Sequence, residues 1–549
     1  MAEREQQLIQ EINSRLEGMK QIRLREEAAW EDIAEIVLPR ISDITTESFD
    51  DVQRRVAENY DSTGRDAVRL WSNGMQGYMT PRNSPWVNVT LGNQDLRRQK
   101  GVRKYLQEVT EALMDQLRRS NFYDALGPTY EHGVTAATAT ITATWDDDRQ
   151  SLVYIPRHPK QVYIADNVFG RVDTVYTVEE MTWRQIVQEF GDSKLTEADK
   201  EAVKRSPFDY KKVLHAVYPR TDRMENKADA KNKPYASIWI LMGQNVLLRE
   251  SGYDQLREVV WRFRVGPGSP YGTGPSHDAL VDLLRAEKIN ETMLRAADLA
   301  VRPPMMFPAE LEGRLKLNPH GMTPYYDPRR TVQPIMQTGQ YPFGLDREQA
   351  IQEKIRSHFR IDFWLMLSQA QGTRTAYEVA QIAGEKAAVM GAEIGRVESE
   401  LLDPLLTVSL HLLSQQGLLP EPPQILADMA AQVGGVNYSY DGPLAQMQKR
   451  HYGQQNILQV LSQVTLIGQT FPQAMDWIDE DALMRQALQS LDAPEDVIRA
   501  QQEVARIREV RQQMQQQQIQ LEQMKQAADI QAQMAKAQAA QPNMMGIQP

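Results

Sequence analysis

A short stretch near the middle of the chain places the tightest limit on its fold. Residues 266–275 hold four glycines and three prolines around Tyr271, so they cannot form regular helix or strand. Ser276 is a good N-cap residue, and no proline follows until residue 303, so a helix can run unbroken to Arg302. At 1.5 Å per residue that helix is roughly 40 Å long. The segment therefore predicts a joint that leads into a long helix.

A glycine-rich loop that opens a helix can also bind a nucleotide. Here no Lys-Ser or Lys-Thr follows the glycines, and their spacing is not G-x-G-x-x-G, so a hinge is preferred. The eight histidines lack metal-ligand spacing, there is no cysteine, and no G-x-S-x-G occurs. The triplet 146–148 is acidic and could attract a cation, but a hairpin turn is favoured. We expect no enzyme activity, no metal and no cofactor.

Length and charge limit the architecture and the partners. A chain of 549 residues exceeds what one hydrophobic core usually serves, so several domains or one large mixed body are expected. The formal net charge is −11, whereas proteins that grip DNA through its phosphates are usually basic, so any DNA contact should be local or weak. No run of 18 apolar residues occurs and the first residues lack an apolar signal region, so we expect no membrane span and no signal peptide.

The first half of the chain predicts grouped helices followed by grouped strands, which is an α+β pattern. The helices are predicted at 3–38, 61–80, 99–119, 121–137 and 183–190. The strands are predicted at 86–91, 141–145, 152–155, 161–164, 171–178, 213–218, 237–242, 246–248 and 259–265.

The second half predicts a helical hairpin. A second long helix begins at Asp346, with Ile351, Ile355 and Phe359 on one face, and ends in a polar loop at 368–373. The irregular residues 303–345 lie between the two long helices as a small head. The first helix carries charges of both signs and only a narrow apolar stripe, formed by Ile289, Met293, Ala296 and Ala300. Packing against copies of itself explains such a helix better than burial inside one subunit.

A third long helix is expected to start at the capping box Thr375-x-x-Glu378 and to kink at Pro404. It should end at Gly417, after which the linker Gly434-Gly435 leads to helices across 443–500. The glutamine-rich tail has a weak heptad pattern, carried by Met514, Leu521, Met524 and Ala528. We expect disorder from Pro542.

Four segments, in this order, resemble the head-to-tail connector, or portal, family of T7-like short-tailed bacteriophages. They are Tyr60-Asp61-Ser62-Thr63-Gly64 through Thr80-Pro81 and Pro85-Trp86; Tyr271-Gly272-Thr273-Gly274-Pro275; Thr373-Arg374-Thr375-Ala376-Tyr377-Glu378-Val379; and Leu402-Asp403-Pro404-Leu405-Leu406, Gly417-Leu418-Leu419-Pro420 and Tyr440-Asp441-Gly442-Pro443-Leu444. The resemblance spans roughly residues 5–500 of the sequence, with the predicted hairpin between the second and third segments. The glutamine-rich tail departs from any fixed pattern.

The resemblance implies a mainly helical α+β portal fold that assembles into a ring. It divides the chain into a first wing part at 1–274, stem helices at 275–302 and 346–370, a clip at 303–345, a channel loop and long wing helix at 371–440, a crown at 441–500, and a glutamine-rich helical barrel or disordered tail at 501–549.

The resemblance also implies a function without catalysis. Rings of this family, generally of twelve subunits, sit at one capsid vertex of the virion, and double-stranded DNA is packaged and ejected through them without sequence specificity. Their partners are the terminase, scaffolding and major capsid proteins, and the tail adaptor and tail tube proteins, with assembly in the host cytoplasm. The alternatives are an internal virion or scaffolding protein and, less favoured, a DNA-packaging or nuclease enzyme.

Three sets of residues are candidates for the work of such a ring. An acidic lumen would repel phosphates, so a few basic side chains at the channel loop would guide DNA without holding it. The candidates there are Gln371, Thr373 and Arg374. Clip residues for adaptor or terminase docking are Tyr325, Tyr326, Arg329 and Arg330, chosen because interfaces favour Tyr and Arg. Contacts between stems are assigned to Asp282, Arg285, Ile289 and Met293.

Overall fold

Helix α1 (Ala2–Val37) confirms the predicted N-terminal helix and spans much of the first of two units in the computed structural model. The units are Met1–His451 and Tyr452–Pro549. The structure describes residues 2–38, 59–97, 99–223, 229–301, 305–306, 333–334, 343–368, 386, 389–428, 435–449 and 501–539.

Two antiparallel sheets form the strand-rich part of the first unit. The three-stranded sheet has the order β3-β2-β9, formed by Ser151–Arg157, Thr138–Asp146 and Glu258–Arg262. The five-stranded sheet runs in chain order through β4 (Val162–Asp166), β5 (Val172–Thr182), β6 (Tyr210–Pro219), β7 (Tyr235–Leu241) and β8 (Val246–Tyr253). Asp146 accepts from the N–H groups of Asp148 and Arg149, so the acidic triplet forms the predicted hairpin turn.

The apolar face of α1 serves both the sheet and the main core. Ile9, Ile12 and Leu16 are buried against the five-stranded sheet, and Ile33 and Val37 are buried in the larger core further along. This i, i+3, i+4 spacing is what an amphipathic helix requires.

Helices cover the remaining core. They are α3 (Thr63–Tyr78), α4 (Gln94–Arg97), α5 (Lys100–Arg119), α6 (Phe122–Thr135), α7 (Trp183–Phe190) and α8 (Glu197–Arg205). Trp71, Trp261 and Trp364 meet in the main core, where the first two rings stack at 6.3 Å and the first and third meet edge to face at 6.2 Å. All three are almost fully buried, so α3, β9 and a segment of the C-terminal half share one core.

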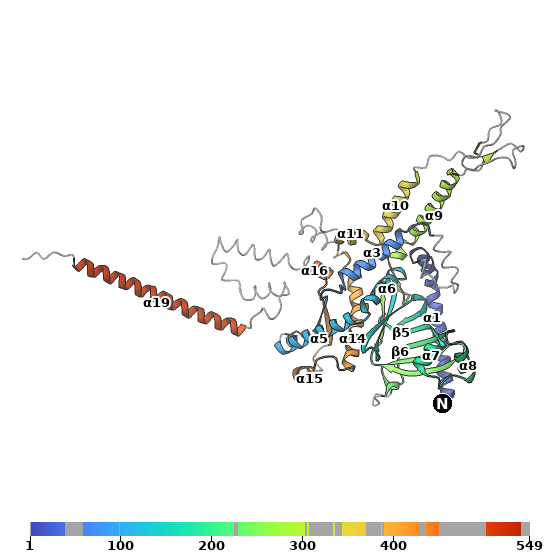
Figure 1. Cartoon of the computed structure of the whole chain (residues 1–549), viewed down its shortest axis with the longest axis horizontal. Helices are drawn as coiled ribbons and strands as arrows, with labels where there is room; N and C mark the ends of the chain where they lie inside the picture. The colour runs from blue at the N-terminus through green and yellow to red at the C-terminus, as the bar shows by residue number, and fades with distance from the viewer. Residues whose placement is uncertain are drawn as a thin grey trace, which may run out of the picture. The chain divides into compact units, whose positions relative to one another are not determined.

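The C-terminal half of the first unit begins with a helical hairpin, α9 (Pro275–Val301) and α10 (Phe343–His358), which Figure 1 shows side by side and projecting from the body of the unit. The short strands β12 (Met305–Met306) and β13 (Gln333–Pro334) pair antiparallel in the predicted head. The later helical elements are α11 (Ile361–Ser368), α13 (Gly391–Arg396), the π-helical turn Val397–Leu402, α14 (Asp403–Gln415), α15 (Gln424–Asp428) and α16 (Pro443–Lys449).

The second long helix is not continuous. It was expected to run over 346–370, but Arg360 has a φ of +52°, and the chain turns there between α10 and α11. A residue in the left-handed region cannot continue an α-helix. The turn lets Phe359 and Trp364 both enter the main core.

Two further expectations were wrong in detail. Gly272–Thr273 forms a strand, β11, which pairs with β10 (Arg264–Val265), although the whole glycine-rich segment was expected to be irregular. After Gly435, strand β14 (Val436–Tyr440) precedes α16 and pairs with β1 (Val87–Leu91), where a linker to helices was expected.

The second unit is described through one element, α19 (Gln501–Ala539), so the glutamine-rich tail is helical over these residues. The helices expected across 451–500, the capping box at Thr375 and the segment from Pro542 lie outside the described residues. No helix in the described part of the chain is long and apolar enough to cross a membrane.

Candidate functional site: a helical hairpin on a glycine-rich joint

Tyr271 anchors the glycine-rich segment to the body of the first unit. Its hydroxyl accepts from the N–H of Ile164 on β4 at 3.2 Å, and its ring meets Trp30 of α1 edge to face at 5.2 Å. Burial raises the pKa of Tyr271 to about 12, so the hydroxyl stays protonated. Ser269 adds a hydrogen bond to Glu26 of α1 at 3.0 Å. The joint is therefore fixed to α1 and to the five-stranded sheet.

Gly272 shows why glycine is needed in this joint. A Cβ atom at this position would lie 2.3 Å from the carbonyl oxygen of Ala137, far inside van der Waals contact. The close approach lets the Gly272 N–H donate to Thr138 Oγ1 at 2.9 Å, next to the β10–β11 pair. Gly272 is therefore required for the close approach of two backbone segments, as expected of a hinge residue.

The start of α9 differs from the sequence prediction. The helix begins at Pro275, and the carbonyl of Gly274 accepts from the N–H groups of His277 and Asp278. Ser276, expected as the N-cap, lies inside the first turn and is fully buried. Proline is well suited to the first helical position because an N–H there would have no partner in the helix, and the helix starts two residues earlier than an N-cap at Ser276 implies.

Arg262 connects the joint to the helix that contains Pro404. Its side chain is 2% exposed and donates through Nη1 to the carbonyl of Pro270 at 3.4 Å and through Nη2 to that of Gly170 at 2.8 Å. The same guanidinium binds the carboxylate of Glu400, with Nη2 to Oε1 at 2.9 Å and Nε to Oε2 at 3.3 Å. One buried cation therefore joins a sheet turn, the glycine-rich joint and the π-helical turn.

The π-helical turn explains how the chain accommodates Pro404. A proline within a helix lacks the N–H that would reach the carbonyl four residues back, which here belongs to Glu400. The structure widens the helix over Val397–Leu402 and starts α14 at Asp403. The predicted disturbance at Pro404 is thus present, and it orients Glu400 toward Arg262.

Burial along α9 stops partway. Ala279, Leu283 and Ala286 are almost fully buried against the main core, together with Ile351 and Ile355 of α10. None of the residues 287–299 is buried, although this stretch includes Leu294, 54% exposed, and Leu299, 46% exposed. The predicted stripe of this half is partly buried at Ile289, Met293 and Ala296, and the most exposed apolar side chains, Leu294 and Leu299, lie outside it.

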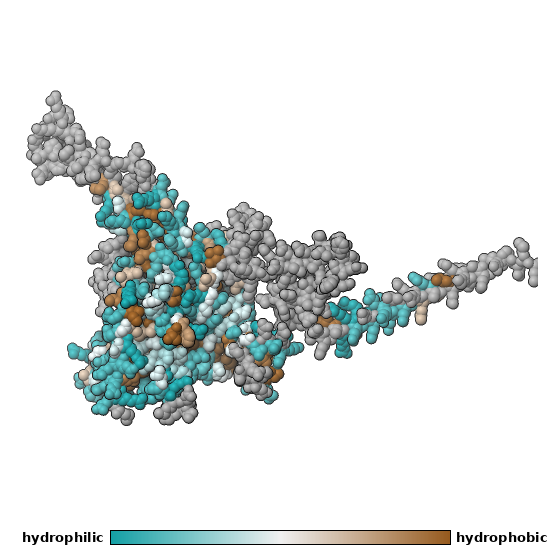
Figure 2. Space-filling view, turned by 180° about the vertical axis from the view of Figure 1, so that it is seen from behind, coloured by the Kyte–Doolittle hydropathy of each residue, from teal (hydrophilic) through white to brown (hydrophobic). Residues whose placement is uncertain are grey.

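Apolar side chains also lie on the outward face of the inner half of α9. Val281 is 57% exposed and Leu284 is 46% exposed, one turn apart. The space-filling view shows apolar patches among hydrophilic surface on the side of the unit that carries the hairpin (Figure 2). Exposed apolar patches of this kind mark interaction surfaces.

Polar contacts hold the two helices of the hairpin to each other and to the body. Asp282 of α9 lies 3.4 Å from His358 of α10 and 3.3 Å from Arg285. Glu287 accepts from the backbone N–H groups of Tyr60 at 2.8 Å and Asp61 at 3.1 Å, and burial raises the pKa of this carboxyl group. The segment that begins at Tyr60 thus supports the hairpin.

The structure places one of the three predicted sets of functional residues. Asp282, Arg285, Ile289 and Met293 all lie on α9. Ile289 packs at the edge of the main core and Asp282 faces α10, so these two are partly used within the subunit. Gln371, Thr373, Arg374, Tyr325, Tyr326, Arg329 and Arg330 lie outside the described residues.

Sequence reasoning missed two features of this region. The Arg262–Glu400 contact joins residues 138 positions apart, and no local pattern announces it. The exposed Leu299 could have been found, because helical periodicity places it opposite the buried face that Ala279 and Leu283 define, whereas Leu294 lies on the same side as Leu283 and is exposed because burial along α9 ends at Ala286.

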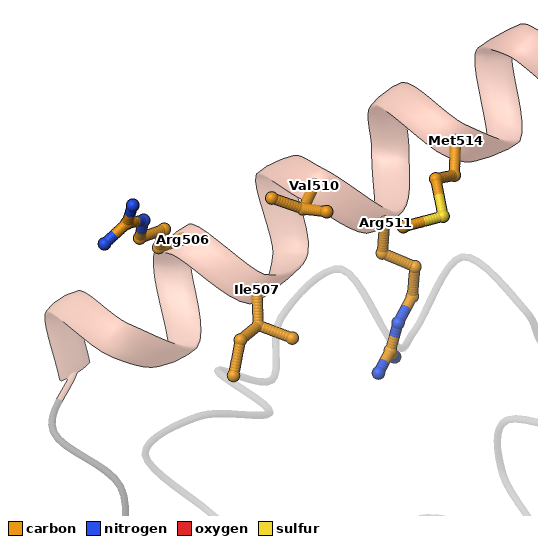
Figure 3. Close-up of a pocket in the computed structure, with 5 residues that line it drawn as sticks. All are labelled: Arg506, Ile507, Val510, Arg511 and Met514. Atoms are coloured by element: carbon orange, nitrogen blue, oxygen red, sulfur yellow. The ribbon is translucent and has the colours of Figure 1, made fainter.

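Helix α19 carries an apolar stripe that is partly or largely exposed at its described positions. Ile507, Val510 and Met514 follow one another at i, i+3 and i+7, with Arg506 and Arg511 beside them (Figure 3). Further along, Leu521 is 59% exposed and Met524 is 73% exposed. These positions continue the a and d spacing of a heptad repeat.

Comparisons with known proteins agree on one family. A family model described as bacteriophage head to tail connecting protein matches residues 9–498. The chain is 27% identical over 525 residues to the probable portal protein of Bordetella phage BPP-1, covering 94% of this chain and 93% of that protein. It is 28% identical over 528 residues to the portal protein of Salmonella phage epsilon15, covering 93% and 92%.

Proposed function

The chain belongs to the family of bacteriophage head-to-tail connecting proteins, and on that premise we propose that it is the portal subunit of its virion. In this proposal the subunits form a closed ring, of about twelve copies as in the family the sequence resembles. The ring sits at one capsid vertex, where double-stranded DNA enters and leaves. The family is a structural one, so the proposed role of the ring is to conduct DNA and to bind the terminase and the tail adaptor.

The observation that carries the ring is the exposed outer half of α9. Fully burying a leucine side chain stabilises a protein by about 1.5–3 kcal/mol. Leu294 and Leu299 are about half exposed in an isolated subunit, so much of this stabilisation is absent there. Charged side chains on the turn before Leu294 form intrahelical pairs, such as Lys288 with Glu291 at 2.8 Å. A neighbouring hairpin would cover the leucines and leave these pairs at the rim, which is the usual arrangement of an interface.

We assign α9 and α10 to the stem, residues 303–345 to the clip and residues 368–374 to the channel loop. The wing would comprise 1–274 and much of 371–440, with the crown at 441–500 and a helical barrel or loose tail at 501–549. Within this scheme Arg374 guides DNA at the constriction, and Tyr325, Tyr326, Arg329 and Arg330 meet the terminase and the tail adaptor. The net charge of −11 per chain would keep the lumen from binding phosphates tightly.

Imaging tests the ring directly. Negative-stain micrographs of the purified chain should show rotationally symmetric rings with a central pore. Leu294→Glu combined with Leu299→Glu should abolish them, because each interface would bury unpaired carboxylates. As a matched control, Val168→Glu combined with Phe169→Glu, at an exposed sheet turn far from α9 in sequence, should leave the rings intact. Chains that stay monomeric at high concentration and on co-expression with scaffolding and capsid proteins would contradict the proposal and favour an internal virion protein.

The channel loop has its own test. Rings that carry Arg374→Ala should assemble normally but should retain packaged DNA less well than wild-type rings. Packaging and retention equal to wild type would remove the role assigned to Arg374 while leaving the ring in place.

A further inference from the structure

The turn between α4 and α5 concentrates positive charge in an acidic chain. From Leu96 to Gln107 the sequence has five basic residues and no acidic one, whereas the whole chain has 62 basic and 73 acidic residues. The described members of this group are Arg97, Lys100, Arg103 and Lys104, which we call the α5 basic patch. Arg98, the fifth, lies outside the described residues.

The patch is built on a packed support. Leu96, Val102 and Leu106 are buried in the main core beneath it, with exposed fractions of 2%, 1% and 8%. The turn is closed by hydrogen bonds from the N–H of Gln99 to the carbonyl of Leu96 at 3.2 Å and from that of Arg103 to the carbonyl of Gln99 at 3.0 Å. The backbone that presents the basic side chains is therefore fixed before any partner arrives.

The basic side chains point to solvent from one helix face. Lys100, Arg103 and Lys104 are all exposed and occupy positions i, i+3 and i+4 of α5, which share a face. Two acidic residues flank the patch in the sequence, Asp95 before it and Glu108 after it. Glu108 lies 3.6 Å from Lys104, and an exposed ion pair of this kind contributes little to stability. The excess of positive charge is a property of the local sequence, since residues 95–111 hold five basic side chains and three acidic ones.

We propose that the α5 basic patch binds the phosphate backbone of double-stranded DNA at a site separate from the channel. Three cations lie within about 6 Å along the helix axis at 1.5 Å per residue, and phosphates of one strand follow each other about every 3.4 Å along the duplex, so adjacent phosphates come within their reach. Figure 1 shows α5 on the side of the first unit away from the α9–α10 hairpin. The site would contact packaged DNA beside the ring, and a ring would present one patch per subunit.

This inference rests on the proposed function only in naming packaged DNA as the ligand. DNA binding by the purified protein therefore tests it without a ring or a capsid. The probe is a fluorescently labelled duplex of random sequence, about 30 base pairs long, titrated with the full-length protein at several salt concentrations. Lys100→Ala, Arg103→Ala and Lys104→Ala together should weaken binding at least about tenfold and reduce the slope of log Kd against log salt by about 2 to 3. Lys100→Arg with Lys104→Arg should bind like wild type.

A matched control changes the same net charge elsewhere. Lys200→Ala, Lys204→Ala and Arg205→Ala on α8 also remove three basic side chains and should leave the slope unchanged. An unchanged affinity in the α5 variant, or an equal loss in both variants, would overturn the proposal. Loss of capsid assembly with unchanged DNA binding would also overturn it and assign the patch to an acidic protein. Ring images are a separate readout, so the failure of either proposal is seen independently.

Discussion

His215 Nδ1 lies 3.5 Å from Glu258 Oε1 in a polar seam between the two sheets, with both side chains at most 3% exposed. His215 belongs to β6, where its ring stacks on Trp239 at 3.9 Å and its Nε2 lies 2.9 Å from Ser237 Oγ. Burial lowers the pKa of His215 well below its usual value and raises that of Glu258 to about 7. At neutral pH the pair is therefore a neutral imidazole beside a carboxyl group that is partly protonated, and not an ion pair.

The stability of the first unit should depend on pH through Glu258. Its pKa is raised from 4.5 to about 7 on folding, chiefly by burial, with Arg157 and Arg257 opposing the rise and Glu179 adding to it. The folded chain therefore holds this proton more tightly, and the stabilisation present below about pH 4.5 is lost as the pH rises to about 7. His215 acts in the opposite direction, since its lowered pKa costs stability as the pH falls below 6.5.

A substitution isolates the carboxyl group. Glu258→Gln should gain stability relative to wild type as the pH rises from about 4.5 to 7, by roughly 3 kcal/mol in total, and the gain should then level off. Urea unfolding of both proteins at a series of pH values measures this difference. Glu111→Gln, at an exposed position of α5, removes the same charge and should show no such trend. A pH-independent difference for Glu258→Gln would contradict the interpretation.

Arg262 should be a major source of stability for the joint. Arg262→Leu removes the buried cation that binds both carboxylate oxygens of Glu400, which keeps its pair with Arg396 at 2.8 Å, and leaves the carbonyls of Gly170 and Pro270 without this donor. Removing one partner of a buried pair typically costs about 3–5 kcal/mol. Thermal unfolding should show the loss, and Arg262→Lys should rescue little of it, because an ammonium group cannot form the same fork. Arg119→Leu, whose pair with Asp115 is exposed, should cost less than about 1 kcal/mol.

Much of the fold follows from local spacing. The stripe Ile351, Ile355 and Phe359 predicted α10 and its buried face, and the alternation after Thr140 predicted the strands of both sheets. These patterns were readable because neighbours in the sequence share one element and one face. The absence of buried residues over 287–299 agrees with the expectation that the first long helix has too little buried surface of its own.

What escaped prediction depends on partners far apart in the sequence. Strand β14 exists because Val436–Tyr440 pairs with Val87–Leu91, and nothing local distinguishes this stretch from a linker after Gly435. The sequence predicted a continuous helix through Arg360 because arginine is a good helix former. In the structure the chain turns at Arg360, and the turn places both Phe359 and Trp364 in the main core. The contact of Arg262 with Glu400 likewise depends on tertiary structure alone.

Gly133 is a place where the core accepts no added atom. A Cβ atom on this residue of α6 would lie 1.9 Å from the ring of Trp261, which is fully buried. Gly133→Ala should therefore destabilise the first unit by about 1–3 kcal/mol, because the indole cannot move without displacing Trp71. Gly77→Ala on α3 meets nothing within 4 Å and should be neutral or stabilising by up to about 1 kcal/mol. Equal stability of the two variants in urea unfolding would show that the tryptophan cluster is looser than it looks.

Helix α19 should become protected when the chain assembles. Its stripe of Ile507, Met514 and Leu521 recurs every seven residues and is left partly or largely exposed, so a helix from another copy would bury it. Hydrogen–deuterium exchange of residues 501–539 should slow markedly in rings compared with monomers of the Leu294→Glu, Leu299→Glu variant. Met514→Glu with Leu521→Glu should keep exchange fast while rings still form, and Gln515→Glu with Gln518→Glu, off the stripe, should exchange like wild type. Equally fast exchange in wild-type rings and monomers would mean that α19 is a loose tail and not a barrel.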